Sequence, residues 1–114
     1  MNMLALILDD DNKVDEVLLT MSELGVRGAT LFDSAGMGAI LRAQVPFTSD
    51  MRNLMHNKKI ANKTILTVIN DQELLRKTIN ALKLQLNLDK PGTGIMFVVP
   101  VTEVYGIAQQ SKTD

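Results

Sequence analysis

The chain has 114 residues, of which 46% are hydrophobic and 22% are charged, and its formal net charge is −1. This length predicts a single domain, residues 1–114, with one modest core. The near-zero net charge provides no long-range field that would attract nucleic acid or an anionic membrane. The absence of cysteine excludes disulfides and thiol catalysis and suits a reducing compartment. We therefore expect a cytoplasmic protein that neither binds nucleic acid nor inserts into a membrane.

The first part of the chain predicts a strand, a helix and a second strand. Residues 3–8 form a continuous apolar run, which is typical of a strand covered on both faces and is too short to span a membrane. Apolar residues then recur at helical spacing from Val14 to Leu24, and Gly25 predicts the end of that helix. The second strand is expected over residues 29–32.

A long loop is expected to follow. Residues 39–63 show no regular periodicity and contain Pro46 and several basic residues. A loop of this length inside a compact domain is uncommon and usually has a function. We therefore expect residues 39–63 to be a functional loop and not part of the core.

The second half of the chain repeats the alternation of strand and helix. Asn70 and Glu73 are spaced as a capping box, which predicts the start of a second amphipathic helix that runs to Leu86. Strands are expected before and after this helix. The remaining predicted segments are a strand over 65–69, a turn over 90–94, a strand over 95–99 and a polar C-terminal tail over 109–114.

The predicted order of elements is βαββαβ, which is the ferredoxin-like arrangement of an α+β fold. Both helices then cover one face of an antiparallel sheet. The other face also carries apolar residues and needs a cover, which argues for an oligomer.

Two glycine-containing stretches are candidates for a ligand site. The first runs from Gly25 to Gly38 and includes Gly28 and Gly36, and the second runs from Gly92 to Val101 and includes Gly94. Glycine allows a ligand to approach the backbone, and consecutive exposed N–H groups can bind a phosphate. Each stretch by itself is also explained by turns between strands.

Taken together, in this strand order, the two stretches resemble the PII signalling family over residues 3–107. The family pattern G-x-x-G-x-T is matched by Gly25, Gly28 and Thr30, and a G-x-G follows at Gly36 and Gly38. The segment 92–97 resembles the family's glycine-containing loop before its last strand. The resemblance implies a homotrimer in which ATP or ADP lies in clefts between subunits, with residues 39–63 as the T-loop.

The resemblance also implies which residues contact the nucleotide. Thr30 and Val68 would lie beside the adenine, and the turn around Met37 would lie beside the ribose and phosphates. The glycine loop would offer backbone donors to phosphate. The complete implied set is Thr30, Gly36, Met37, Gly38, Ala39, Val68, Gly92, Thr93, Gly94 and Ile95.

The chain departs from the family pattern at its charged positions. The family's phosphate-binding lysine is replaced by Ile95, and two arginines of the C-terminal segment are replaced by Gly106 and Ala108. Other cations would have to contact the phosphates, and Mg²⁺ is left open. The candidates are Arg42, Lys58, Lys63 and Lys90.

No catalytic or metal site is predicted. His56 is the only histidine, and no cysteine and no ordered pair of carboxylates accompanies it. A hydrolase on this scaffold would need an anion-binding loop with a positioned arginine and a side chain that activates water, and no such set can be assembled. We therefore do not expect an enzyme.

The expected function is that of a signal-transduction protein. It would sense ATP or ADP and regulate a partner, such as a membrane transporter or a metabolic enzyme, through residues 39–63. Two alternatives stay within the same superfamily. One is a receptor for a cyclic dinucleotide, a branch whose last strand ends in a pattern similar to Val98-Val99-Pro100-Val101, and the other is a ligand-free structural trimer like the CutA proteins.

Overall fold

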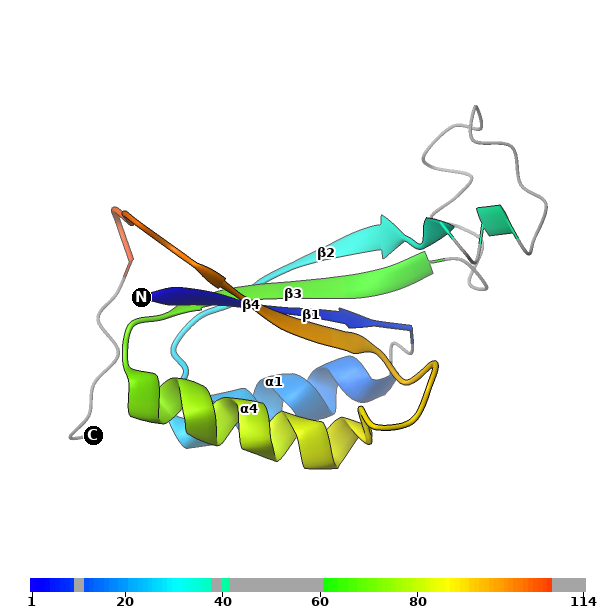
Figure 1. Cartoon of the computed structure of the whole chain (residues 1–114), viewed down its shortest axis with the longest axis horizontal. Helices are drawn as coiled ribbons and strands as arrows, with labels where there is room; N and C mark the ends of the chain where they lie inside the picture. The colour runs from blue at the N-terminus through cyan, green and yellow to red at the C-terminus, as the bar shows by residue number, and fades with distance from the viewer. Residues whose placement is uncertain (10–11, 38–39, 42–60, 108–114) are drawn as a thin grey trace.

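A computed structural model describes residues 1–9, 12–37, 40–41 and 61–107. These residues form a four-stranded sheet with two helices packed on one face (Figure 1). This arrangement confirms the predicted α+β class and the βαββαβ order. The elements are β1 (Asn2–Leu8), α1 (Asn12–Leu24), β2 (Thr30–Ala35), β3 (Ala61–Ile69), α4 (Gln72–Leu86) and β4 (Ile95–Pro100).

The strands lie in the order β2-β3-β1-β4, and every neighbouring pair is antiparallel. β1 is therefore an inner strand that pairs with β3 on one side and β4 on the other. Its backbone groups pair with two neighbours, and its side chains at residues 4, 5, 6 and 8 are buried while Met3 and Ile7 are partly buried, which accords with its continuous apolar sequence. β2 and β4 are the two edges of the sheet.

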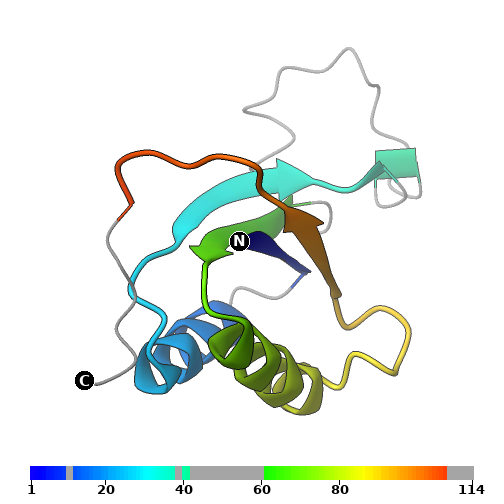
Figure 2. The ribbon, with the colours of Figure 1, turned by 60° about the vertical axis from the view of Figure 1, so that its left-hand side comes forward.

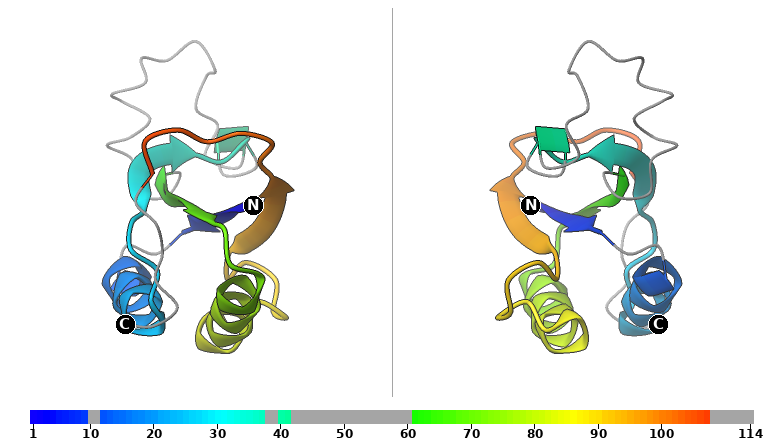
Figure 3. Two further views of the ribbon diagram at one scale, coloured as in Figure 1. Left: turned by 90° about the vertical axis from the view of Figure 1, so that its left-hand side faces the viewer. Right: turned by 90° about the vertical axis from the view of Figure 1, so that its right-hand side faces the viewer.

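The core lies between the sheet and the two helices. Leu4, Leu6 and Leu8 of β1 are completely buried, and Ile65 and Ile69 of β3 lie on the same face because the register pairs Leu6 with Ile65. The helices run side by side beneath this face (Figure 3). They contribute the buried residues Val14, Val17, Met21, Leu74, Leu75, Leu82 and Leu86.

The helix ends follow local signals in the sequence. Gly25 has a φ of 111°, and its N–H donates to the carbonyl oxygen of Ser22 at 3.1 Å, so it ends α1 as predicted. At the start of α4 the prediction was wrong by one residue. The N-cap is Asp71 and not Asn70, because the carboxylate of Asp71 accepts hydrogen bonds from the N–H groups of Glu73 and Leu74.

The strands around residues 39–63 are longer than the sequence pattern predicted. β2 continues to Ala35, and β3 begins at Ala61 instead of residue 65. The additional residues of the two strands are mostly polar, so the apolar pattern of the sequence did not predict them. Lys63 therefore belongs to β3, although it was assigned to the loop, and the rest of the predicted loop lies largely outside the described residues.

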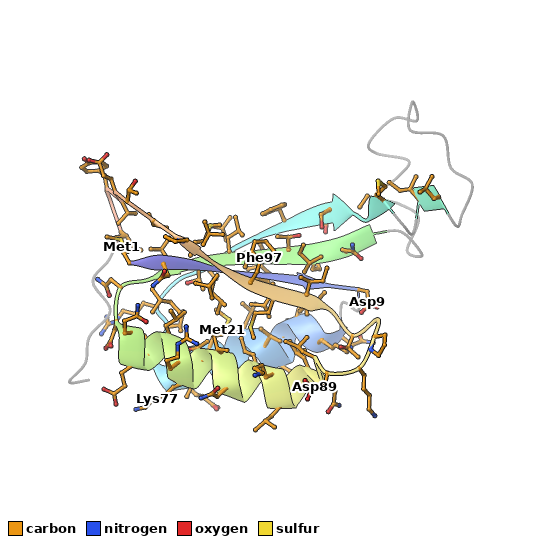
Figure 4. All side chains as sticks on the ribbon, viewed as in Figure 1. Met1, Asp9, Met21, Lys77, Asp89 and Phe97 are labelled. Carbon is orange, nitrogen blue, oxygen red and sulfur yellow. The ribbon has the colours of Figure 1, made fainter. Side chains whose placement is uncertain are left out.

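The face of the sheet away from the helices is uncovered in a single chain. The register places Phe32, Ile95, Phe97 and Val99 on this face, and all four are partly exposed. Phe97 lies on the side of β4 opposite the helices (Figure 4). A homotrimer that buries this face stays a prediction. Within the described ranges, no helix is long and apolar enough to cross a membrane.

Removing a core side chain of α4 should test the packing of the helices on the sheet. Leu82 is completely buried in the core cluster, whereas Leu84 on the same helix is 82% exposed. We expect Leu82→Ala to lower the free energy of unfolding by about 2–5 kcal/mol per subunit, and Leu84→Ala by less than about 0.5 kcal/mol. Denaturant unfolding followed by circular dichroism measures both. Equal losses of unfolding free energy in the two variants would contradict the assignment of Leu82 to the face of α4 that packs on the sheet.

Candidate functional site

The two glycine-containing stretches lie at the same end of the sheet but at opposite edges. Gly36 follows the end of β2, and Gly94 precedes the start of β4. Two inner strands, β3 and β1, separate these edges, and three strand spacings amount to roughly 14 Å. One phosphate group therefore cannot contact both stretches within one chain.

A pocket of about 490 Å³ opens on the uncovered face near the start of β2. Met3, Leu66 and Val68 provide an apolar wall, and Thr30 lies at the rim. Residues 101–107 pass over this side of the sheet from the β4 edge toward the β2 edge, which brings Gly106 and Ile107 into the pocket (Figures 2 and 3). The remaining lining residues are Arg27, Gly28, Ala29 and Thr67.

A buried hydroxyl fixes the backbone at the mouth of this pocket. The Thr67 hydroxyl donates to the carbonyl oxygen of Gly28 at 2.6 Å, and Thr67 is 3% exposed. This bond ties the segment between α1 and β2 to the inner strand β3. One side of the pocket is therefore anchored to an inner strand of the sheet.

Of the predicted nucleotide contacts, the structure brings two into this pocket. Thr30 and Val68 both line it, as implied for residues beside an adenine. Gly36 and Met37 lie at the far end of β2, and Gly38 and Ala39 lie outside the described residues. Gly92, Thr93, Gly94 and Ile95 lie at the opposite edge of the sheet.

The candidate cations have different surroundings. The ammonium group of Lys63 forms an ion pair with the carboxylate of Asp33, its register partner on β2. Lys90 is exposed in the turn after α4, where its carbonyl oxygen accepts a hydrogen bond from the Thr93 hydroxyl at 2.9 Å. Arg42 and Lys58 lie outside the described residues.

A second hollow, of about 550 Å³, runs between α4 and the edge strand β4. Two basic residues of α4, Arg76 and Lys83, line one wall, and Gly94 and Ile95 line its other side. The sequence analysis missed both cations. Their spacing of seven residues, about two helical turns, could have placed them on one stripe with Ile79. The other lining residues are Leu88, Asp89, Met96, Phe97 and Val98.

The family is shown by comparison with known sequences. The family model for "Nitrogen regulatory protein P-II" matches residues 1–111. A nitrogen regulatory protein P-II from Azospirillum brasilense is 28% identical over 100 residues, which cover 88% of this chain and 86% of that protein. The chain belongs to the nitrogen regulatory protein P-II family. The resemblance noted in the sequence is thereby confirmed, and the P-II chain is a member of a family of regulatory proteins.

In this P-II chain, glycine is required at positions 92 and 94 for different structural reasons. Gly94 has a φ of 139°, and a Cβ at this position would lie 3.0 Å from the backbone oxygen of Ile7. Gly92 has a φ of 79° with no atom within 4 Å of such a Cβ. The need for glycine at position 94 therefore comes from packing against β1, whereas the space beside Gly92 is open. Within the part of the chain that is described, no group of three metal-ligating side chains gathers near these residues or elsewhere.

Alanine substitutions should separate these two roles. We expect Gly94→Ala to lower the free energy of unfolding by about 3 kcal/mol or more, because the backbone strain and the contact with Ile7 add. Gly92→Ala carries the strain alone and should cost about 1–2 kcal/mol. Thermal and denaturant unfolding of both variants would measure this. A smaller loss for Gly94→Ala than for Gly92→Ala would show that the contact with β1 is wrongly assigned.

Proposed function

We propose that this P-II family protein senses an adenine nucleotide, ATP or ADP, in clefts between the subunits of a homotrimer. Residues 39–63 would then transmit the bound state to a partner protein, such as a transporter or a metabolic enzyme. The observation that carries the proposal is the pocket at the start of β2, which brings together Thr30 and Val68 from two strands.

The chemistry of this pocket suits a flat, mostly apolar ring with polar edges. Met3, Leu66 and Val68 can pack against the faces of a base, and the Thr30 hydroxyl can donate to or accept from a ring nitrogen. Residues 27–29 lie outside the strand ladder and are exposed, although the Gly28 carbonyl oxygen already accepts the hydrogen bond of Thr67. Such a site would recognise the base, and the negative charge of the phosphates would have to be bound by residues outside this pocket.

The separation of the two glycine stretches supports a cleft between subunits. Within one chain they occupy opposite edges of the sheet, so they can act on one nucleotide only if the β2 edge of one subunit faces the β4 edge of another. The partly exposed apolar residues Phe32 and Phe97 lie near these two edges. An assembly that buries the open face would bring the edges together.

Removing the Thr30 hydroxyl should weaken nucleotide binding without unfolding the protein. Thr30→Val keeps the shape and the strand propensity of the side chain, so we expect the affinity for ATP, ADP and adenosine to fall by about three- to tenfold. Isothermal titration calorimetry measures the affinities.

Thr20→Val is the control, because it removes a hydroxyl that donates to the Glu16 carbonyl oxygen on α1. The proposal fails if the wild-type protein binds no adenine nucleotide. Tight binding of a cyclic dinucleotide instead would favour the receptor alternative, and binding of no ligand would favour the structural trimer.

If residues 39–63 transmit the signal, their amide hydrogen exchange should depend on the nucleotide. This segment begins three residues after Gly36, so a ligand near that turn can act on it directly. We expect saturating ATP or ADP to change exchange in peptides from 39–60 and to leave the buried face of α1 unchanged. Mass spectrometry of peptic fragments measures both regions. Identical exchange over 39–60 with and without bound nucleotide would rule out this segment as the responding element.

A further inference from the structure

The segment that follows β4 crosses the open face of the sheet and reaches the pocket at the start of β2. Residues 101–107, here called the C-terminal strap, pass from the β4 edge toward the β2 edge (Figures 2 and 3). Gly106 and Ile107 of the strap line the same pocket as Thr30 and Val68. The strap therefore forms one wall of the pocket that we propose for the base.

Only the first residue of the strap is anchored by a hydrogen bond. Pro100 pairs with Asn2 at the end of β4, and the Val101 N–H then donates to the carbonyl oxygen of Met1 at 3.0 Å. Within the described part of the chain, none of residues 102–107 forms a hydrogen bond. A segment with no backbone hydrogen bonds and few buried side chains opens at a small cost in free energy. The strap can therefore lift from the sheet while β4 stays in place.

The far end of the strap is apolar where it lines the pocket. Ile107 is 41% exposed, so more than half of its surface is covered. It shares the pocket with the apolar wall formed by Met3, Leu66 and Val68. Residues 101–107 contain no cation, and Glu103 is their one charged residue. The strap is therefore suited to cover an apolar ring and not to bind a phosphate.

Gly106 provides the turn that brings Ile107 to the pocket. Its φ is 83°, in the left-handed region that favours glycine. A Cβ at this position would meet no atom within 4 Å, so only the backbone conformation requires glycine here. An alanine at position 106 would disfavour this turn and leave every side chain of the pocket unchanged. This substitution can therefore loosen the strap without altering the surface beneath it.

We propose that the C-terminal strap is a lid that closes over the base of the bound nucleotide, with Ile107 contacting the ring and Gly106 forming the turn. This inference rests on the proposed nucleotide-sensing function. Because the strap crosses the face on which the pocket opens, a base must pass it to enter and is enclosed when the strap returns. Such a lid controls the rates of entry and release. It acts on the base and is indifferent to the number of phosphates.

The strap carries its own spectroscopic reporter. Tyr105 is the only tyrosine of a chain that has no tryptophan, so the tyrosine emission comes from this one position. It is 85% exposed and directly precedes Gly106. The anisotropy of its fluorescence therefore follows the mobility of the strap. We expect the anisotropy to rise when ATP, ADP or adenosine binds, and to fall in unliganded Ile107→Ala, because that variant lacks the side chain that holds the strap at the pocket.

Binding kinetics test the lid directly. Stopped-flow fluorescence and calorimetry would compare Ile107→Ala and Gly106→Ala with the wild-type protein, using ATP, ADP and adenosine. We expect both variants to raise the association and the dissociation rate constants, with an affinity loss of about three- to tenfold that is equal for the three ligands. Thr30→Val, by contrast, should raise the dissociation rate constant alone. Leu19→Ala is the matched control, because it truncates another partly exposed aliphatic side chain, on α1.

The outcomes separate the lid from the proposed function. If the wild-type protein binds adenine nucleotides and both strap variants keep the rate constants of Leu19→Ala, the strap is not a lid, and nucleotide sensing still stands. If the wild-type protein binds neither nucleotides nor adenosine, the proposed function fails. The anisotropy of the unliganded proteins then decides the strap: a lower value in Ile107→Ala supports its attachment at the pocket, and an unchanged value overturns it. Sedimentation and thermal unfolding confirm that each variant remains folded and assembled.

Discussion

The position of β1 inside the sheet determines where every other functional element lies. β1 pairs with β3 and β4 at once, and its alternate side chains enter the core, so it can be neither shifted nor exposed without losing the fold. Because β1 and β3 occupy the inner positions, β2 and β4 must be edges. The two glycine-containing stretches are joined to those edge strands. Their separation is thus a consequence of the fold and not of the local sequence of either turn.

The same constraint explains which parts of the fold were readable from the sequence. β1, α1 and α4 have a buried face or a buried strand, so the apolar pattern predicts them closely. β3 was predicted too short because its first residues are polar: Thr64 meets Ser34 at 2.7 Å, and Lys63 pairs with Asp33. These polar contacts between β2 and β3 extend the ladder beyond the apolar run of β3, and a search for hydrophobic periodicity cannot detect them.

The candidate site was predictable only in part, for a geometric reason. Thr30 and Val68 were named individually from a family resemblance, and the sheet brings them together because β2 pairs with β3. Gly106 and Ile107 were not predicted to join them, because they reach the pocket through an irregular segment that passes over the open face. Arg76 and Lys83 were missed because a cation on a helix is usually a solvated surface charge. Their position beside β4 distinguishes them from Lys77, which is paired with Glu73 on the same helix.

The distribution of charge also changes what the base of the 39–63 segment can do. Lys63 was a candidate for binding phosphate, but its register places it opposite Asp33, and the two side chains form an ion pair that links β2 to β3. A ligand would have to replace this pair to recruit Lys63, and the released Asp33 would then repel the same phosphate. Arg76 and Lys83 meet no such competition in the described part of the chain. Among the described residues, Arg76 and Lys83 of α4 therefore carry positive charge that no ion pair neutralises, beside β4 and across the sheet from β2. A ligand at the β4 edge lies across the sheet from the base of the 39–63 segment in the same chain, whereas in the proposed trimer it would face the β2 edge of a neighbouring subunit, so the proposed sensing would be a property of the assembly.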